Sequence, residues 1–513
     1  MSLSKKEPLI VLAIFFLALG LNFFPFLWRS FTTPENKVFT GAQFYTDDYA
    51  VYVSYLKQGE QGRWTVTDKY THEPHPASLI HEEYLLWGKL WGWLGVSPIL
   101  AYHLGRLVFG LLFLSLTYLL LLKFFPGTQE SVLRLASLAL ICFSAGFIEK
   151  TGLPYLNWLT EVDPTQRLAS LMHYLIGFDS LLAIFIIFWS QKKNWLWVLA
   201  LSIITGFILP SSLLMVVTTL LIFGVLTRFS DKGLGKLILV LLLGFLPFLL
   251  YSLYIFKIPP WSHILALEKT NRGPFTLEQY LLSLGIIAFV FPLGLLDLKN
   301  RRRLVLFLLS WIAATFIWIF GLADIFGFNP TRFLQIPVFI PLAVLGVLGV
   351  SRVFKKPPIS GMLICLMLLA GLPTIRLSFK NQLLLNADYP PLVYPNKSLV
   401  EAMTFLEENS QPEELVLTFY YAGNLLPFFS GNQVYLGHLQ ETLDYDLKAA
   451  KAKEFFVGKM APEQARQFLE ESLTNYVFWA PQEKSFGGRI DKYSFLAPVF
   501  NNEEVIIFRF QNH

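Results

Sequence analysis

Apolar segments long enough to cross a lipid bilayer recur along most of this chain. They fall in blocks of about twenty residues, which is the length that a helix needs to span the hydrocarbon core. Of the 513 residues, 54% are hydrophobic and only 15% are charged. A soluble protein of this length needs far more polar surface. The sequence therefore predicts a polytopic α-helical membrane protein.

The pattern predicts about eleven transmembrane helices. The expected spans are 9–28, 101–122, 133–148, 168–190, 195–209, 211–227, 237–256, 280–297, 304–321, 333–350 and 360–376. Basic residues gather in alternate loops, for example at Lys192, Lys193 and 301–303, and the positive-inside rule places these loops in the cytoplasm. An odd number of helices then puts the first loop, about 29–100, and the tail, about 377–513, outside.

Two domains are expected. Residues 1–376 form the transmembrane domain, and its long first loop carries juxtamembrane helices. From about residue 398 the tail alternates helical and strand patterns, such as a helix at 445–456 and a strand at 476–479. This alternation predicts that residues 377–513 form an extracytoplasmic α/β domain.

Two adjacent carboxylates, Asp47 and Asp48, follow the first span. Beside a bilayer they are costly unless they face water, a metal ion or a substrate. One of them could deprotonate an acceptor hydroxyl or hold a divalent cation against a phosphate, with Asp48 as the metal ligand. Alternatively, Asp47 caps the following helix and Asp48 stabilises its first turn. The residues alone leave both interpretations open.

Helical spacing in the first loop predicts a short amphipathic helix after the aspartates, because Tyr49, Tyr52, Val53 and Leu56 share one face. A second stripe, formed by Tyr84, Trp87, Trp91 and Leu94, is typical of a helix lying in the membrane interface.

His72, Glu73 and His75 lie in a loop stiffened by two prolines. They could bind a metal ion or a phosphate, but their spacing matches no standard zinc pattern, so an exposed polar loop is the alternative.

Three further polar residues lie in or beside apolar spans. His173 is either a buried hydrogen-bonded residue or a substrate contact. Arg332 suits a lipid-linked phosphate, which a guanidinium can hold with two parallel hydrogen bonds, or else it extends to the interface. Arg106 carries the same two alternatives.

Several functions have no support in the sequence. There is no GxGxxG after a strand, no complete Walker loop, no GxSxG and no HExxH, so neither a nucleotide cofactor nor a serine hydrolase mechanism is expected. The basic residues report topology and do not indicate nucleic acid. Cys142 and Cys365 both lie in apolar segments, and no disulfide is expected.

The order of these parts resembles the GT-C superfamily of membrane glycosyltransferases, and more closely a bacterial group of such proteins. The matching stretches are TDDY at 46–49 through KQG at 57–59, YTHEPH at 70–75, SPILAYHLGR at 97–106, GNQVYLGH at 431–438 and ETLDY at 441–445.

The resemblance implies transfer of a sugar, with inversion, from a polyprenyl-phosphate donor to a glycan, lipid or protein acceptor outside the cytoplasm. Asp47 or Asp48 is then the catalytic base or a ligand of Mg or Mn. Glu73, His75 and His173 become substrate-binding candidates beside Arg332 and Arg106. The implied location is the bacterial cytoplasmic membrane.

Two other functions stay open. A transporter or flippase for lipid-linked glycans would need polar residues deep within several helices and usually an internal repeat, which the sequence does not show. A non-catalytic assembly protein would use its tail to bind glycan and its spans as an anchor.

Overall fold

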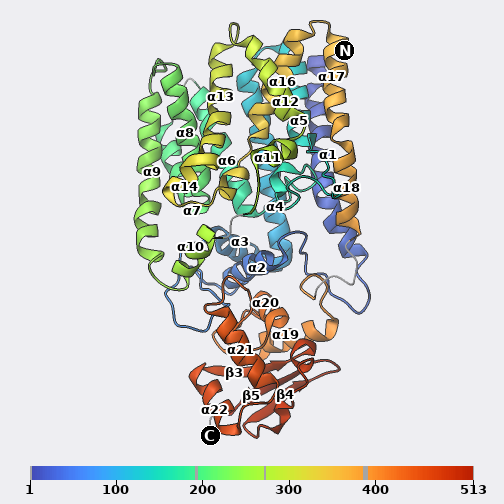
Figure 1. Cartoon of the computed structure of the whole chain (residues 1–513), viewed down its shortest axis with the longest axis vertical. Coiled ribbons are helices and arrows are strands. Elements are labelled where there is room, and N and C mark those ends of the chain that lie inside the picture. Colours follow the sequence, from blue (N-terminus) through green and yellow to red (C-terminus); the bar gives the residue numbers. More distant parts are fainter. Residues whose placement is uncertain (1–2, 191–193, 271–272, 385–390, 512–513) are drawn as a thin grey trace. The chain divides into compact units, whose positions relative to one another are not determined.

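In the computed structural model the chain forms two compact units. Figure 1 shows its helices and strands, coloured along the sequence. The structure describes residues 3–190, 194–270, 273–384 and 391–511. Lys192 and Lys193, on which the predicted orientation partly rests, lie outside the described residues. Unit 1 comprises Met1–Pro25, Leu104–Ser252 and Glu268–Leu384, and unit 2 comprises Phe26–His103, Leu253–Leu267 and Leu385–His513.

Unit 1 is built from helices, some of which continue into unit 2 at one end. They are α1 (Leu3–Phe31), α4 (Pro98–Phe124), α5 (Ser131–Phe143), α6 (Met172–Trp189), α7 (Trp195–Ile208), α8 (Pro210–Leu226), α9 (Leu234–Ile255), α11 (Leu277–Leu284), α12 (Ile287–Val290), α13 (Arg302–Ile317), α14 (Ala323–Phe326), α15 (Thr331–Leu334), α16 (Phe339–Val353), α17 (Pro357–Ala370) and α18 (Leu372–Leu383). Short 3-10 or π segments lie at Thr128–Glu130, Thr160–Val162, Phe291–Asp297 and Trp318–Leu322.

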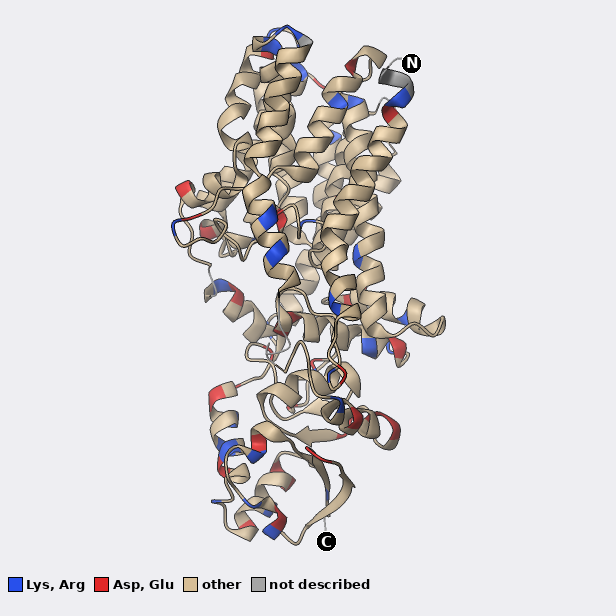
Figure 2. Cartoon of the chain, turned by 90° about the vertical axis from the view of Figure 1, so that its right-hand side faces the viewer, with Lys and Arg blue, Asp and Glu red and all other residues tan. Residues whose placement is uncertain are grey.

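Many of these helices are long and apolar enough to cross a bilayer. Among the described residues, six helices meet that condition by length and composition, and α11 joined to the segment Ile287–Asp297 gives a seventh, bent candidate. Each of the eleven predicted spans overlaps at least one helix of unit 1, although the count of eleven stays a prediction. Residues coloured as charged are sparse along these helices (Figure 2). The chain is a multi-pass membrane protein.

Local sequence explains several helix ends. The side chain of Asn194 accepts hydrogen bonds from the backbone N–H groups of Leu196 and Trp197 and so caps α7. The predicted span 280–297 is not one straight helix, because the chain turns by 104° after α11. Gly285 lies at this break with φ +68°, and a Cβ there would collide with the carbonyl oxygen of Ala145.

Unit 2 contains a five-stranded mixed sheet with the order β2-β1-β3-β5-β4. The strands are β1 (Leu415–Leu417), β2 (Gln433–Val434), β3 (Thr474–Trp479), β4 (Leu496–Asn501) and β5 (Ile506–Phe510). β1 runs parallel to β2 and β3, and β5 runs antiparallel to β3 and β4. Aromatic residues such as Phe455, Phe468 and Phe508 form the core of this part. The predicted C-terminal α/β fold is confirmed.

The helices of unit 2 come from both ends of the chain. They are α2 (Thr46–Glu60), α3 (Glu82–Trp93), α10 (Trp261–Thr270, with its last residues in unit 1), α19 (Lys397–Asn409), α20 (Tyr420–Phe429), α21 (Tyr445–Phe456), α22 (Pro462–Glu471) and α23 (Pro481–Lys484), with a 3-10 turn at Ile490–Lys492. Helix α2 packs against both α3 and α20.

Two glycines allow α2 and α3 to approach closely. A Cβ at Gly59 would collide with the carbonyl oxygen of Leu85, and one at Gly88 with that of Leu56. The close packing corrects the predicted interfacial stripe, because Tyr84 at its start is fully buried. The exposed apolar face of α3 consists instead of Leu86, Leu90 and Trp93, and Leu94 continues it just after the helix.

The first loop and the C-terminal residues are joined by polar contacts within unit 2. Lys57 Nζ lies 2.5 Å from Glu407 Oε1, and the backbone N–H of Val434 donates to the carbonyl of Lys69 over 2.9 Å. The predicted domain boundary after residue 376 stays a prediction, whereas the contacts place residues 26–103 and 385–513 in one compact unit.

Candidate active site

The acidic pair lies in the first turn of α2. This helix begins at Thr46, and its N-cap residue is Tyr45, which adopts left-handed backbone angles with φ 47°. Asp47 and Asp48 therefore lie inside the helix, and neither accepts a capping hydrogen bond. The capping interpretation of Asp47 is wrong, because its side chain is directed to another element. The positive end of the helix still stabilises both carboxylates.

Asp47 accepts a strong hydrogen bond from the C-terminal part of the chain. Tyr420 Oη, in the first turn of α20, donates to Asp47 Oδ2 over 2.6 Å. Burial and the neighbouring carboxylate raise the pKa of Tyr420 above its ordinary value. The phenol therefore stays protonated and remains a donor to Asp47.

Asp48 faces a histidine from the same region. His438 Nε2 lies 3.5 Å from Asp48 Oδ1. The imidazole is 4% exposed, whereas the Asp48 side chain is 44% exposed, so one partner is fixed in the core and the other is open to solvent. The two carboxylates are thus distinguished by their partners, a phenol for Asp47 and an imidazole for Asp48.

The start of α20, which carries Tyr420, is held by the residues around α23. The buried carboxylate of Glu483 accepts hydrogen bonds from the hydroxyl of Thr418 over 3.0 Å and from the N–H of Phe419 over 2.6 Å. Gln482 Oε1 accepts from the N–H of Tyr421 over 2.8 Å. Burial raises the pKa of Glu483 to about 7. The position of Tyr420 therefore depends on a buried titratable group.

Glu73, a predicted substrate contact, is paired within unit 2. Lys448 Nζ lies 2.8 Å from it, and the hydroxyl of Thr71 also donates to its carboxylate. Burial opposes ionisation of Glu73, but the hydrogen bonds from Lys448 and Thr71 outweigh it and lower its pKa. Glu73 thus connects the first loop to α21, and His72 Nδ1 lies 3.4 Å from it.

His75 has both ring nitrogens engaged. Nδ1 donates to the carbonyl of Glu73 over 2.8 Å, and Nε2 accepts from the N–H of Asp68 over 3.1 Å. Its ring also packs edge-on against Trp261, with the centroids 6.0 Å apart. These contacts give His75 a structural role in its loop, and its role as a substrate contact stays a prediction.

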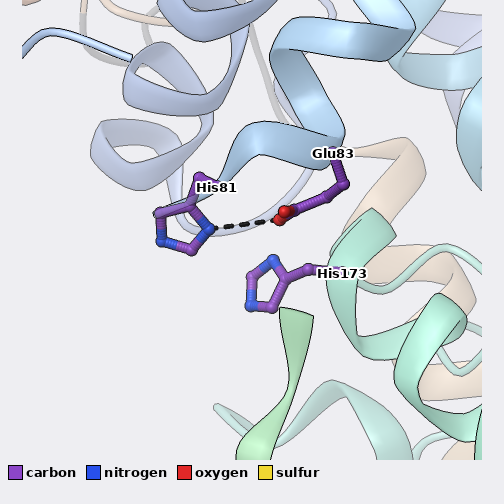
Figure 3. A group of neighbouring side chains, drawn as sticks. All are labelled: His81, Glu83 and His173. Carbon is purple, nitrogen blue, oxygen red and sulfur yellow. Dashed lines mark hydrogen bonds and ion pairs between the residues drawn. The ribbon is translucent and has the colours of Figure 1, made fainter. Parts of the chain in front are cut away.

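A third histidine–carboxylate pair lies at the start of α3. His81 Nδ1 is 3.2 Å from Glu83 Oε1 (Figure 3). His81 adopts a left-handed backbone conformation with φ 60°, and its ring stacks on Tyr55 at 5.8 Å. Imidazole and carboxylate are both metal ligands, so this pair offers two donor atoms at the start of α3.

Arg332 in unit 1 is held by two side chains. Its Nε donates to Glu268 Oε2 over 3.0 Å, its Nη2 donates to the other oxygen of the same carboxylate, and its Nη1 donates to the hydroxyl of Tyr174. The fork therefore already binds one planar anion with two parallel hydrogen bonds. The side chains of Arg332 and Glu268 are 38% and 33% exposed, so solvent reaches the pair.

His173 and Arg106 are both buried residues of unit 1. His173 is the second residue of α6, and its ring lies 4.4 Å from that of Tyr174. Arg106 donates to the carbonyl of Ala169 and lies 5.7 Å from the ring of Phe23. Arg106 thus supports the loop that precedes α6. Contact of either residue with substrate stays a prediction.

That loop is fixed by a buried arginine. Arg167 donates to the carbonyl oxygens of Glu161, Ile141, Ser144 and Val162. Glu161 is buried and accepts hydrogen bonds from the hydroxyls of Thr160 and Ser170 through Oε1.

The sequence did not single out Tyr420, His438 or Glu268 as site residues. Tyr420 follows Asp47 by 373 residues, so spacing carries no information about their contact. His438 does fall within the stretch 431–438 that resembles the GT-C superfamily, which is a usable signal.

No family model and no curated protein matches the sequence. Solved structures do match it. The Archaeoglobus fulgidus oligosaccharyltransferase, in a complex with Zn and sulfate, aligns over 98% of this chain and 73% of its own, with a TM-score of 0.55 and 14% identity. ArnT from Cupriavidus metallidurans, bound to undecaprenyl phosphate, aligns over 98% of this chain and 97% of its own, with a TM-score of 0.52 and 12% identity.

A third neighbour is the arabinofuranosyltransferase AftD from Mycobacteria, which aligns over 98% of this chain and 40% of its own, with a TM-score of 0.53 and 12% identity. All three are glycosyltransferases of the GT-C superfamily. The chain has the GT-C fold. Sequence identities of 12–14% establish a shared fold only, so the chemistry depends on the residues at the site.

Proposed function

We propose that this protein is a glycosyltransferase that moves a sugar, with inversion, from a polyprenyl-phosphate-linked donor to an acceptor outside the cytoplasm. The observation that carries the proposal is the acidic pair at the start of α2, held by Tyr420 and facing His438 in a chain with the GT-C fold. Both carboxylates are half-exposed, so an acceptor hydroxyl or a cation can reach them.

The proposed reaction needs one base. An oxygen of the acceptor attacks the anomeric carbon of the donor and forms the new glycosidic bond, while the bond from that carbon to the phosphate oxygen breaks. One of Asp47 and Asp48 accepts the proton of the attacking hydroxyl. The polyprenyl phosphate leaves with the electron pair of the broken bond.

A divalent cation, Mg or Mn, fits the chemistry of Asp48. Its Oδ2 has no hydrogen-bond partner among the described residues, and its side chain is 44% exposed. Carboxylate oxygens of this kind suit hard divalent cations. When bound, such an ion would supply positive charge beside the leaving phosphate.

The donor's phosphate is assigned to Arg332. The similar structure of ArnT contains undecaprenyl phosphate, and a structure of the Archaeoglobus fulgidus oligosaccharyltransferase contains a dolichol-phosphate. Both support a donor of this class. The guanidinium of Arg332 already binds the carboxylate of Glu268 in the geometry that a phosphate would also use. Glu73, His75, His173 and Arg106 are proposed as further substrate-binding residues. The proposed location is the bacterial cytoplasmic membrane, with unit 2 on the outer side.

The test is donor consumption by the purified full-length chain in lipid nanodiscs. A set of polyprenyl-phosphate sugars is supplied with an extract of cell-envelope glycans and lipids, with and without Mn²⁺, and free polyprenyl phosphate is measured. We expect release with one donor and loss of release in the Asp47→Asn Asp48→Asn double variant. Equal release by the wild type and the double variant contradicts the assignment of the acidic pair.

A further inference from the structure

The imidazole of His438 is oriented by the backbone that follows it. Its Nδ1 accepts hydrogen bonds from the N–H groups of Gln440 and Glu441, both over 3.2 Å. The carbonyl of His438 accepts from the N–H of Thr442 over 3.0 Å, and the hydroxyl of Thr442 donates to the carbonyl of Tyr70 over 2.8 Å. This turn therefore fixes the ring against the first loop.

The same contacts determine which ring nitrogen carries the proton. A neutral imidazole has one N–H and one acceptor nitrogen. Because two backbone N–H groups point at Nδ1, that nitrogen is the acceptor, and Nε2 carries the hydrogen. Nε2 is the atom that faces Asp48 Oδ1 at 3.5 Å.

We propose that His438 is a positioning residue that donates its Nε2–H to Asp48 Oδ1 and so directs Asp48 Oδ2 toward the reacting groups. The expected effect on kcat rests on the proposed transferase function. The hydrogen bond to Asp48 and the position of the proton on His438 rest on the contacts alone. The proposal holds whether Asp48 accepts the proton of the acceptor or holds a cation. In either case a carboxylate fixed at one oxygen loses less entropy when the other oxygen binds.

A purely structural role for His438 makes a different prediction. In that case the ring only supports the turn at 438–442, and the contact with Asp48 has no consequence. The two roles can be separated because they use different nitrogens of the ring. Any residue that satisfies the two backbone N–H groups preserves the turn, whereas only a donor at the position of Nε2 reaches Asp48.

Three variants use this difference. His438→Asn offers an oxygen near the position of Nδ1, where Asn side chains accept from following backbone N–H groups, but no donor to Asp48. His438→Gln offers an NH₂ group near the position of Nε2. His438→Ala offers neither. His263→Asn, on α10, is the matched control for replacing a histidine with asparagine.

For the kinetic measurement we expect His438→Asn to lower kcat about 10- to 100-fold, the range found for partners that orient ligands and catalytic groups. The donor KM and the melting temperature should stay near those of the wild type. His438→Gln should recover part of kcat, and His263→Asn should match the wild type. Wild-type kcat in His438→Asn, or equal kcat in His438→Asn and His438→Gln, would overturn the proposal.

The second measurement does not depend on activity. Nitrogen NMR of the full-length chain, labelled with ¹⁵N at histidine in nanodiscs, distinguishes the two neutral tautomers. The signal of His438 is assigned by its disappearance in His438→Asn. We expect a protonated Nε2 whose signal moves in Asp48→Asn and not in Tyr493→Phe, a control change elsewhere in unit 2.

The two measurements separate the possible failures. If no donor is consumed but the Nε2–H tautomer and its response to Asp48→Asn are found, the transferase function fails and the contact stands. If donor is consumed but Nδ1 carries the proton, or if Asp48→Asn leaves the His438 signal in place, the positioning role is wrong and the function stands.

Discussion

Tyr420 Oη donates a 2.6 Å hydrogen bond to Asp47 Oδ2, so a residue of α20 controls the orientation of a carboxylate at the start of α2. The contact connects two helices of one compact unit that come from opposite ends of the sequence. It gives Asp47 a fixed oxygen, and it makes the C-terminal residues part of the candidate site.

The first prediction concerns this hydrogen bond. Tyr420→Phe keeps the ring and removes only the hydroxyl, so the proposed transfer rate should fall roughly 10- to 100-fold, the range expected for losing a hydrogen bond to a charged group. Tyr493→Phe removes a buried hydroxyl that bonds the carbonyl of Met460 and serves as the control. Transfer rates and melting temperatures are compared. Equal loss in both variants would show that the effect is one of general stability.

The second prediction concerns the carboxylates. Asp47→Asn and Asp48→Asn each remove a charge and keep the shape of the side chain. Replacing the proton acceptor should lower the transfer rate by roughly 10²–10⁴. Since neither residue caps α2, both variants should fold, which circular dichroism and gel filtration check. Full activity in both single variants and in the double variant would remove the pair from the mechanism.

The third prediction concerns Arg332. Arg332→Gln should raise the donor KM roughly 10- to 100-fold, because a charged bidentate contact with the phosphate is lost. Arg332→Lys should retain part of the affinity. Glu268→Gln should lower the donor KM, because it removes the anion that competes for the guanidinium.

The melting temperature distinguishes binding from structure in the same variants. The side chains of Arg332 and Glu268 are each about one third exposed. Ion pairs with this exposure contribute only about 0–1 kcal/mol to stability. We therefore expect small changes in melting temperature. An unchanged donor KM in Arg332→Gln would mean that Arg332 does not bind the donor and only pairs with Glu268 and Tyr174.

The fourth prediction concerns the pH dependence of stability. Burial raises the pKa of Glu483 from 4.5 to about 7, so the folded state holds this proton more tightly than the unfolded state. The free energy of unfolding should therefore fall as the pH rises from about 4.5 to 7, by up to about 3 kcal/mol for this group. Glu483→Gln lacks the titrating proton.

The measurement is the difference in melting temperature between Glu483→Gln and the wild type at several pH values. The variant should gain stability relative to the wild type between pH about 4.5 and 7, and the difference should be constant above that range. A difference that does not change with pH would contradict the role assigned to burial.

The fifth prediction concerns membrane orientation. In a Cys365→Ala background, which removes the exposed native thiol, a cysteine replaces Leu447 in unit 2 or Gly235 in the first turn of α9. Leu447 is 74% exposed, and a Cβ at Gly235 meets no atom within 4 Å. An impermeant thiol reagent should label Leu447→Cys in intact cells and Gly235→Cys only after permeabilisation. The reverse pattern would place unit 2 in the cytoplasm.

Apolar periodicity predicted most of the elements because it reports local burial. Helix α21 has the predicted bounds, 445–456, and every predicted span overlaps a helix. Helix α20 was missed because Gly423 and Pro427 interrupt its pattern, although Pro427 lies inside the helix. Strand β4 was missed for a similar reason, since Pro498 lies within it at the edge of the sheet.

The candidate site was predicted only in part. Adjacent carboxylates are visible in a sequence, so Asp47 and Asp48 could be named. Their partners could not, because Tyr420 lies 373 residues away from Asp47, and contacts over such separations depend on the fold as a whole. The same holds for Glu268, whose pairing with Arg332 joins two segments without any local pattern.

The contacts of Tyr420 and His438 also have a consequence for biosynthesis. A ribosome that has made Asp47 and Asp48 must add nearly four hundred residues before His438 emerges, which takes roughly 20–80 s at 5–20 residues per second. During that interval the carboxylates have neither of their partners. A chain whose synthesis stops before residue 420 would insert its spans and present an acidic pair that nothing orients. The candidate site is therefore complete only after both Tyr420 and His438 have been synthesised and have folded against α2.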